Sequence, residues 1–369
     1  MKKKSQDRVI ITGGHHNSAL VVAEKLRKKG YKVIWFGHKF SMWGDKKPGA
    51  EYEEVTRAGF EFIEIKAGKF YRTYHPLKLV RIPFGFVQSF YCLLKFRPNL
   101  ILSFGGYLAV PVVISGWLMR VPIITHEQTV VYGLANRVIQ FFAKKILVSW
   151  ESSLKHFPAR KAIHTGLPVR PEIFNQIKGK FDFKNDLLTL YVTGGKQGSH
   201  LINQVLAEAL PELVEKYNLI HQCGRSTIYD DLAFLSKIKS RLPEKLKKRY
   251  LVRDYIFQPE IGSVFAVADL VVSRAGAHIT YEIAALGKPT LFIPIPWSHA
   301  NEQFKNAQIL KQAGLAEILI QEKLSAENLS RMIRMMIANL DQYKKSSAKA
   351  QKLVKLDAAK KIVELVKKL

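Results

Sequence analysis

The chain has 369 residues and a mass of 42.0 kDa, which is the size of two domains. Apolar residues make up 47% of it and charged residues 24%, an ordinary globular composition that excludes a mostly disordered chain. Lys and Arg number 58 against 30 Asp and Glu, and the resulting net charge of +28 favours an anionic partner: nucleic acid, a membrane surface or an anionic substrate. The two cysteines, Cys92 and Cys223, exclude a disulfide-rich secreted scaffold and a four-cysteine zinc site.

Neither an export signal nor a membrane span is expected from the apolar runs. The run behind the basic N-terminus, residues 9–11, stops at Gly13-Gly14, which is too short for a signal peptide. The longest apolar stretch, residues 107–119, contains Pro111 and Gly116 and is shorter than the roughly 20 residues that cross a bilayer. We therefore expect a cytoplasmic protein whose membrane contact is peripheral.

The first half of the chain alternates strand-like and helix-like segments. A helix over residues 18–29 is predicted by apolar residues at helical spacing and ends at Gly30. The predicted strands are residues 8–12, 31–36, 60–65, 100–104, 123–126 and 145–149. This alternation predicts a parallel sheet covered by helices on both faces.

The same pattern restarts in the second half. The predicted strands there are residues 187–192, 218–222, 250–252, 270–273 and 290–293. A strand followed by Gly-Gly and a helix occurs twice, at Gly13-Gly14 and at Gly194-Gly195. We therefore predict two doubly wound α/β domains of residues 1–165 and 166–345, joined near the Gly- and Pro-containing segment 164–171. Residues 346–369 are predicted as a basic amphipathic helix that packs on either domain.

Both Gly-Gly pairs stand where a parallel sheet binds ligands, at the carboxyl end of a strand. Glycine lets the backbone approach a ligand, and the N-terminus of the following helix favours an anion. Neither pair has the spacing of a dinucleotide fingerprint, and no Walker loop is present. Taken alone, each pair is explained equally well by an ordinary turn.

A stronger candidate is the segment 273–282. A strand meets a small-residue turn in which the N–H groups of Gly276 and Ala277 can cap a diphosphate, and Glu282 on the next helix can accept hydrogen bonds from ribose hydroxyls. The segment 301–303 follows the next strand with amides and a carboxylate for sugar hydroxyls. The alternative is ordinary helix capping with a surface Glu.

Titratable groups also stand at strand ends in the first half. His126-Glu127-Gln128 ends one strand, Gly105-Gly106-Tyr107 ends the preceding one, and His15 follows the first. A neutral histidine is a competent general base, although a lone histidine is more often structural. No H-E-x-x-H, D-x-D or G-x-S-x-G motif is present, so neither a metal site nor a serine triad is predicted.

Residues 65–126 contain no Asp or Glu, but eight Lys or Arg and eleven aromatic residues. At the centre of this stretch, basic residues alternate with aromatic and aliphatic ones, an arrangement that fits an anionic lipid surface. The residues expected to dock are Arg72, Lys78, Arg81, Phe84 and Phe86. Nucleic acid would use the same charges, but its phosphate backbone fits the apolar residues less well. A core helix with basic side chains reaching to solvent is the structural alternative.

Eight motifs in chain order resemble the MurG family of N-acetylglucosaminyltransferases, which complete the lipid-linked peptidoglycan precursor. They are Thr12-Gly-Gly-His15, Phe104-Gly-Gly-Tyr107, His126-Glu-Gln128 with Gly133-Leu-Ala-Asn-Arg137, Gly166-Leu-Pro-Val-Arg170, Gly194-Gly-Lys-Gln-Gly198, His221-Gln-Cys-Gly224, Ser273-Arg-Ala-Gly276 and Asn301-Glu-Gln-Phe-Lys-Asn-Ala307. Each motif is short, but their order along residues 9–316 makes the resemblance specific.

The resemblance implies a GT-B fold, two Rossmann-like domains with the active site in the cleft between them. It implies that N-acetylglucosamine passes with inversion from UDP-N-acetylglucosamine to an undecaprenyl-diphosphate-linked muramoyl peptide, at the cytoplasmic face of the membrane. No resident cofactor and no nucleic-acid partner are expected with this activity, and its dependence on a divalent metal ion is left open. The C-terminal helix would return to the N-terminal domain.

The resemblance also implies roles for individual residues. His15 matches the general base, and Glu127 is the second expected catalytic residue. Donor and substrate binding is expected of Thr12, Gly13, Gly14, Thr129, Arg170, Gly195, Lys196, Gln197, Phe257, Gln258, Arg274, Gly276, Ala277, His278, Ile279, Glu282, Glu302 and Gln303. Acceptor binding is expected of Gly105, Gly106, Tyr107 and Asn136.

The chain departs from the family pattern in its sugar and phosphate sites. Thr129 stands where the family has Asn, and Lys196 replaces a Ser of the Gly-rich loop. Lys196 would either add a positive charge on the donor diphosphate or signal a different donor. Two alternatives therefore stay open: a related GT-B transferase for another lipid acceptor, and a non-catalytic binder of membrane or nucleic acid.

Overall fold

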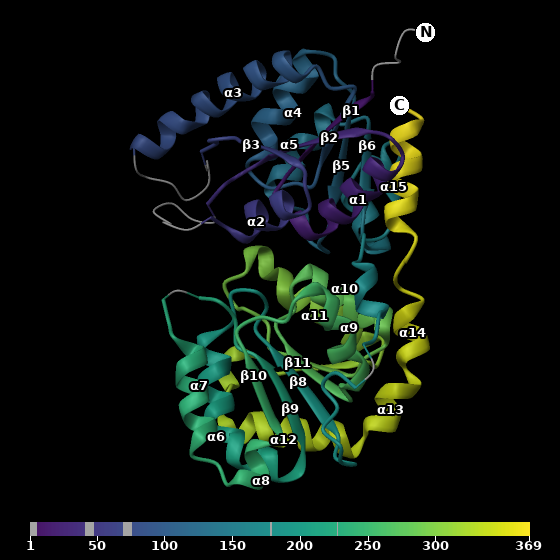
Figure 1. Ribbon diagram of the computed structural model, residues 1–369. Helices are drawn as coiled ribbons and strands as arrows, with labels where there is room; N and C mark the ends of the chain where they lie inside the picture. Colours follow the sequence, from purple (N-terminus) through teal and green to yellow (C-terminus); the bar gives the residue numbers. More distant parts are fainter. Residues whose placement is uncertain (1–5, 41–47, 69–75, 178, 227) are drawn as a thin grey trace. The chain divides into compact units, whose positions relative to one another are not determined.

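The computed structural model describes residues 6–40, 48–68, 76–177, 179–226 and 228–369 (Figure 1). The chain forms two compact units. The first comprises Met1–Arg170 and Lys355–Leu369, and the second comprises Pro171–Val354. Each is an α/β unit with one parallel sheet, so the predicted fold class of two doubly wound parallel-sheet domains is confirmed.

The first unit is built on a seven-stranded parallel sheet in the order β3-β2-β1-β4-β5-β6-β7. Its strands are β1 (Arg8–Thr12), β2 (Lys32–Gly37), β3 (Glu61–Glu64), β4 (Leu100–Ser103), β5 (Ile123–Glu127), β6 (Lys145–Val148) and β7 (Ala162–His164). Six of them lie where the sequence predicts strands. The edge strand β7 was not predicted, because its three residues are only partly buried and carry no apolar run.

Helices cover both faces of this sheet. They are α1 (His16–Lys28), α2 (Ala50–Arg57), α3 (Pro76–Phe96), α4 (Ala109–Leu118), α5 (Leu134–Phe142), the 3-10 helix η1 (Glu151–His156) and α15 (Ala358–Lys367). Adjacent residues of β1 point to opposite faces, so Ile11 packs with α1 and α15. Ile10 packs with α3, α4 and α5 on the other face. The first strand, β1, therefore lies in the middle of the sheet, covered on both sides.

The second unit is built on a six-stranded parallel sheet in the order β10-β9-β8-β11-β12-β13. Its strands are β8 (Thr189–Thr193), β9 (Asn218–Gln222), β10 (Tyr250–Arg253), β11 (Leu270–Ser273), β12 (Thr290–Phe292) and β13 (Ala316–Ile318). The order reverses between β8 and β11, which is the position where open parallel sheets bind ligands. The short edge strand β13 was not predicted.

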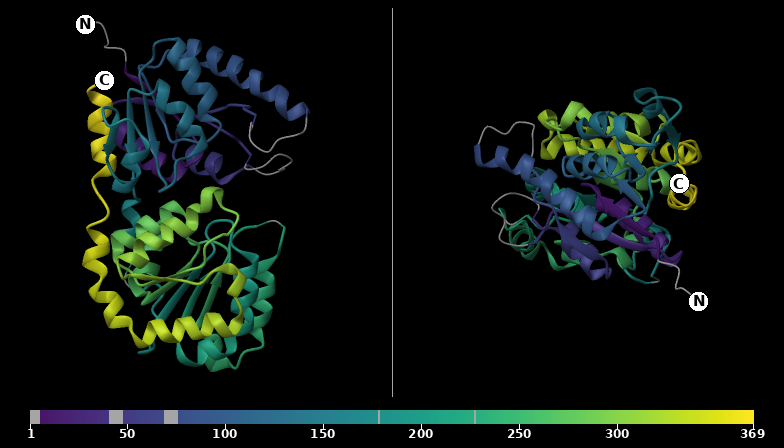
Figure 2. Two further views of the ribbon diagram at one scale, coloured as in Figure 1. Left: turned by 180° about the vertical axis from the view of Figure 1, so that it is seen from behind. Right: turned by 90° about the horizontal axis from the view of Figure 1, so that it is seen from above.

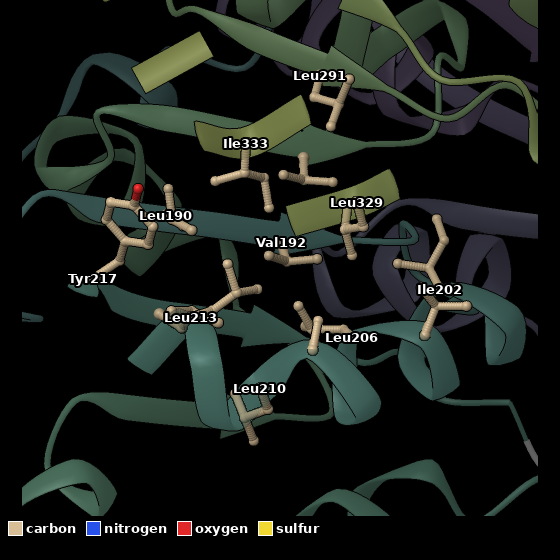
Figure 3. Packing of buried hydrophobic residues seen from close by; sticks show 14 of the residues in the cluster. Leu190, Val192, Ile202, Leu206, Leu210, Leu213, Tyr217, Leu291, Leu329 and Ile333 are labelled. Carbon is tan, nitrogen blue, oxygen red and sulfur yellow. The ribbon is translucent and has the colours of Figure 1, made fainter. Parts of the chain in front are cut away.

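The helices of the second unit are α6 (His200–Lys216), α7 (Asp231–Ser240), α8 (Glu244–Lys247), α9 (Gln258–Val267), α10 (Ala277–Leu286), α11 (Glu302–Gln312), α12 (Ala326–Ala338), α13 (Leu340–Lys345) and α14 (Ser347–Gln351), with 3-10 helices η2 (Pro171–Phe174), η3 (His299–Asn301) and η4 (Gln321–Lys323). Figure 3 shows one core of this unit, where Leu190 and Val192 of β8 lie between Leu206 and Leu213 of α6 and Ile333 of α12. On the opposite face, the buried ring of Tyr191 lies 5.6 Å from that of Phe265 on α9.

The single helix predicted for residues 346–369 is wrong. The segment forms α14 and α15, and the stretch between them is not helical (Figure 2). Ser347 Oγ donates a hydrogen bond to the Gly287 carbonyl at the end of α10, which ties α14 to the second unit. Lys355 Nζ donates to the His164 carbonyl, and Val363 of α15 is buried in the first unit. The two halves of the segment therefore pack against different units.

Candidate active site

Two glycine turns meet at the carboxyl end of the first sheet. Gly13 follows β1 with φ +132°, and Gly105 and Gly106 follow β4 with φ +71° and +80°. The N–H of Gly14 donates to the Gly105 carbonyl at 3.2 Å. A Cβ on Gly13 would stand 2.7 Å from that same oxygen, so the close approach of the two turns requires glycine.

His15 is the residue before α1 and lies beside these turns. Burial, and to a smaller extent the neighbouring His16, lowers its pKa from 6.5 to about 4. Burial also lowers the pKa of His126 to about 4, and the charge of His15 contributes to that shift. His15 is therefore a neutral imidazole at physiological pH, the state in which it can accept a proton.

Two further polar atoms at the strand ends are free to bond a ligand or water. Thr12 Oγ1 and His126 Nδ1 are buried without a hydrogen-bond partner among the described residues. The other ring nitrogen of His126, Nε2, lies 2.9 Å from the Gly166 carbonyl. A buried polar atom without a partner costs free energy, so such atoms are common where a substrate completes the hydrogen bonds.

Glu127 holds the loop that follows β5. Its carboxylate accepts hydrogen bonds from Asn136 Nδ2 at 3.0 Å, Gly133 N at 3.0 Å and Thr129 N at 3.4 Å. Burial raises the pKa of Glu127, and these hydrogen bonds oppose the rise. The hydroxyl of Thr129 donates to the Val131 carbonyl within the loop. The contacts that Glu127, Thr129 and Asn136 make thus fix the conformation of this loop from inside.

In the second unit, the Gly-rich loop after β8 packs on the loop after β9. Gly195, Gly198 and Gly224 all have positive φ, and a Cβ on Gly198 would stand 1.9 Å from the Cys223 carbonyl oxygen. Gln222 Nε2 donates to the Gly195 carbonyl at 3.0 Å. No heavy atom lies within 4 Å of the place where a Cβ on Gly195 would stand, so the tip of the loop is open.

Arg274 connects this loop to the end of β12. Its Nη2 donates to Ser199 Oγ at 2.7 Å and its Nη1 to the Ile293 carbonyl at 3.0 Å. Burial lowers the pKa of Arg274 to about 10, so the side chain is still charged at neutral pH. It places a positive charge between the Gly-rich loop and the segment 294–303.

The N-terminus of α10 is open. Its first turn begins at Gly276, around whose Cβ position no heavy atom lies within 4 Å. Gln303 Oε1 accepts hydrogen bonds from Ala275 N at 3.3 Å and Ile295 N at 3.1 Å, which fixes the turn before the helix. Glu282 lies further along α10 and is buried. An unobstructed helix N-terminus between fixed loops is suited to a diphosphate.

Aromatic side chains extend this site on the side of β10. The ring of Phe257 is 41% exposed and lies 5.2 Å, edge to face, from that of Tyr255. The guanidinium of Arg225 lies over both rings. Phe257 was expected from the sequence, whereas Tyr255 and Arg225 were missed, because only the fold brings the loops after β9 and β10 together.

Comparison with known proteins shows the family to which the chain belongs. Residues 9–148 match the glycosyltransferase family 28 N-terminal domain, and residues 189–365 match the C-terminal domain of the same family. A UDP-N-acetylglucosamine–N-acetylmuramyl-(pentapeptide) pyrophosphoryl-undecaprenol N-acetylglucosamine transferase of Bacillus cereus is 32% identical over 91% of this chain and 93% of its own length. The chain belongs to the MurG family. It is therefore a glycosyltransferase, as its motifs predict.

Two other relatives agree with this assignment. The enzyme of the same name from Clostridium botulinum is 31% identical over 98% of this chain and 99% of its own length. The crystal structure of MurG from Acinetobacter baumannii has a TM-score of 0.73 and 24% identity, covering 98% of this chain and all of the other. That likeness shows the GT-B fold, which was also predicted.

The remaining residues expected from the MurG family belong to both units. In the first unit, Tyr107 follows Gly106 and its ring lies 6.0 Å from that of His38. Arg170 is the last residue of this unit before Pro171. In the second unit, Lys196 and Gln197 lie in the Gly-rich loop, Ala277, His278 and Ile279 form the first turn of α10, and Glu302 begins α11. The side chain of Gln258 lies outside the described residues.

The apolar surface of the first unit is wider than the sequence predicts. Of the expected docking residues, Arg72 and the side chains of Lys78 and Arg81 lie outside the described part; Phe84 is exposed and Phe86 half-buried. Three neighbouring helices, α3, α4 and α5, carry large exposed apolar side chains. Besides Phe84, these are Val87, Phe90, Tyr91, Leu94, Trp117, Leu118, Leu134, Val138 and Phe141. The residues on α4 and α5 were missed because only the fold brings these helices beside α3.

Within the described residues, no helix is long and apolar enough to cross a bilayer. The same part of the chain contains no group of three or more His, Cys, Asp or Glu side chains placed to hold a metal ion.

Proposed function

We propose that this chain transfers N-acetylglucosamine from UDP-N-acetylglucosamine to an undecaprenyl-diphosphate-linked N-acetylmuramoyl peptide in peptidoglycan synthesis. The names of its MurG-family relatives state this reaction. The observation that carries the proposal is the open N-terminus of α10 at Gly276, flanked by Arg274 and Gln303 at the switch point of the second sheet. This is the arrangement that a nucleoside-diphosphate sugar requires.

The second unit would hold the donor. The N–H groups at the start of α10 and the open Gly195 turn bind the diphosphate, and they stabilise the charge that develops on it as the sugar leaves. Lys196 of the same loop would add a positive charge beside the diphosphate. We prefer this role for Lys196 to the alternative that it marks a different donor. Glu282 would bind the ribose and Gln303 the sugar.

The first unit would hold the acceptor and the base. The acceptor hydroxyl attacks the anomeric carbon and gives its proton to the neutral imidazole of His15. The bond between that carbon and the diphosphate oxygen breaks, and UDP leaves with the electron pair. Because one displacement takes place, the configuration is inverted. Glu127 would act by holding the loop of Thr129 and Asn136 in place.

The first unit would also dock on the cytoplasmic face of the membrane. Its sequence carries 33 Lys and Arg against 12 Asp and Glu, a net charge of 33 − 12 = +21 out of the +28 of the whole chain. On α3, Val87, Phe90, Tyr91 and Leu94 repeat at helical spacing and are all exposed. Contiguous exposed apolar side chains mark an interaction surface, and each basic residue near an anionic leaflet adds about 1 kcal/mol of attraction.

The proposal is tested by the choice of acceptor. Purified protein is incubated with UDP-N-acetylglucosamine and, in separate reactions, with the lipid-linked muramoyl peptide, diacylglycerol or a soluble muramoyl peptide without diphosphate. We expect product with the first acceptor alone. Product with diacylglycerol instead would assign the chain to another lipid acceptor and overturn the proposal.

A further inference from the structure

A cation–aromatic cluster lies beside the Gly-rich loop at the carboxyl ends of β9 and β10. The guanidinium carbon of Arg225 is 5.1 Å from the centre of the Tyr255 ring and 5.0 Å from that of Phe257. Arg225 Nε also donates to Asp254 Oδ2 at 2.9 Å. One side chain from the loop after β9 thus contacts three residues of the loop after β10.

The same residue joins this aromatic pair to the Gly-rich loop. The backbone N–H of Arg225 donates to the Lys196 carbonyl at 3.0 Å, and that of Gly224 donates to the Asp254 carbonyl at 2.9 Å. Gln222 strengthens the connection, since its Oε1 accepts from Ile256 N at 2.9 Å while its Nε2 donates to the Gly195 carbonyl. The aromatic pair is therefore held at a set distance from the loop that would carry the diphosphate.

The exposure of these groups argues against a purely structural cluster. Phe257 is 41% exposed, and the Arg225 and Asp254 side chains are 45% and 41% exposed. An ion pair this exposed adds little stability by itself, and an aromatic ring this exposed gains little from burial. An accessible aromatic ring beside a phosphate-binding loop is, however, what a nucleobase stacks on.

We propose that Arg225 is a positioning residue for the nucleobase of the donor. It lies across Tyr255 and Phe257 and, anchored by Asp254, orders the aromatic pair for stacking of the base while the Gly-rich loop and α10 hold the diphosphate. This inference rests on the proposed function, because it takes a nucleoside-diphosphate sugar as the ligand. Arg225 acts through the rings and takes no part in the chemical step.

The test uses the full chain with Arg225→Leu and a matched control, Arg241→Leu. Arg241 is an exposed arginine in the same unit, at the end of α7, and no contact of its side chain with the aromatic pair is seen. Affinity for UDP, the KM for UDP-N-acetylglucosamine, kcat and the melting temperature are measured for each. We expect Arg225→Leu to raise the Kd for UDP and the donor KM about fivefold, a part of what loss of a base–aromatic stack costs. Its kcat and melting temperature stay close to those of the parent protein and of the control.

Two further variants keep the test decisive if Arg225→Leu folds poorly. Asp254→Asn leaves the arginine without its anchor, so we expect the same change in KM at smaller size. Arg225→Lys keeps the charge beside Asp254 but loses the planar stack, so it recovers only part of the affinity. An unchanged donor KM in folded Arg225→Leu or Asp254→Asn, or a loss of kcat in step with melting temperature, would overturn the inference while leaving the proposed transferase intact. A parent protein that binds no UDP would contradict the proposed function itself.

Discussion

Gly13 and Gly105 touch through their backbones, and the contact leaves no room for a side chain on Gly13. A Cβ there would stand 2.7 Å from the Gly105 carbonyl oxygen and 2.8 Å from the Phe104 carbonyl carbon. The φ of Gly13, +132°, is also one that other residues rarely adopt. The contact joins the turns after β1 and β4, so it fixes the backbone from which the side chains of His15 and Tyr107 extend.

Gly13→Ala should therefore destabilise the first unit and lower transfer activity. The strain and the clash together should cost about 1–3 kcal/mol of the free energy of unfolding. Gly14→Ala is the matched control, because no heavy atom lies within 4 Å of its Cβ position. Urea unfolding of both variants checks the prediction, and equal stabilities would contradict it.

Gly276→Leu should weaken donor binding without unfolding the second unit. A leucine side chain would extend into the open space at the N-terminus of α10, where the diphosphate is expected, and should raise the Kd for UDP by about tenfold or more. Gly198→Ala should behave differently: its Cβ would meet the Cys223 carbonyl at 1.9 Å, so its melting temperature should fall. Titration calorimetry and thermal melting separate the two effects, and full affinity for UDP in Gly276→Leu would disprove the assignment.

The transfer rate should be insensitive to the protonation of His15 near neutral pH. Because its pKa is lowered from 6.5 to about 4, the imidazole stays unprotonated as pH falls from 8 to about 5. The pH profile of kcat/KM should therefore show no bend caused by His15 over that range. The kcat of His15→Ala should be lower than that of the parent protein by about 10²–10⁴-fold. A bend near pH 6.5 that disappears in His15→Ala would show that His15 titrates normally.

The buried histidines should make the protein less stable in acid. Folding lowers the pKa of His126 to about 4 and that of His221 to about 3, both from 6.5. Below pH 6.5 the unfolded chain therefore binds more protons than the folded protein. The stability that the buried neutral histidines contribute is complete above pH 6.5 and is lost as pH falls toward 4. The loss should reach about 3 kcal/mol for His126. His221→Gln should flatten the stability profile between pH 6.5 and 4, and an unchanged slope would count against the burial of a neutral His221.

Phe141→Glu should weaken membrane binding and leave UDP binding intact. Phe141 on α5 and Ile228 in the second unit are both 74% exposed, so Ile228→Glu is a control of equal exposure and equal charge change. In sedimentation with phosphatidylglycerol vesicles, we expect a reduced bound fraction for Phe141→Glu alone. Equal losses in both variants would point to net charge, with no special role for the α3–α5 surface.

Local patterns in the sequence were enough to predict both sheets and most of the glycine turns. The runs that became β1 and β8 are rich in β-branched or apolar residues and end at Gly-Gly, so strand, turn and helix could all be predicted. The strands β7 and β13 have three residues each and no such pattern. The helix break between α14 and α15 was missed because it depends on which unit each half packs against.

The residues of the candidate site that stand in sequence motifs could be predicted. Those that come together only through the fold could not. Gly276 and Gln303 stand in recognisable motifs, and the structure brings them together through the Ala275 hydrogen bond. Arg225 and Tyr255 are 30 positions apart and become neighbours only because β9 pairs with β10. Neither segment has a sequence pattern that predicts such a contact between the ends of two parallel strands.

The central claim is tested most directly by sugar transfer itself. The full chain is incubated with radiolabelled UDP-N-acetylglucosamine and the undecaprenyl-diphosphate-linked muramoyl peptide, with and without detergent and divalent cations, and label is counted in the extracted lipid. The account predicts labelled lipid that requires the acceptor and falls steeply in His15→Ala. Absence of label from the lipid under every condition, with folded protein and intact acceptor, would contradict it.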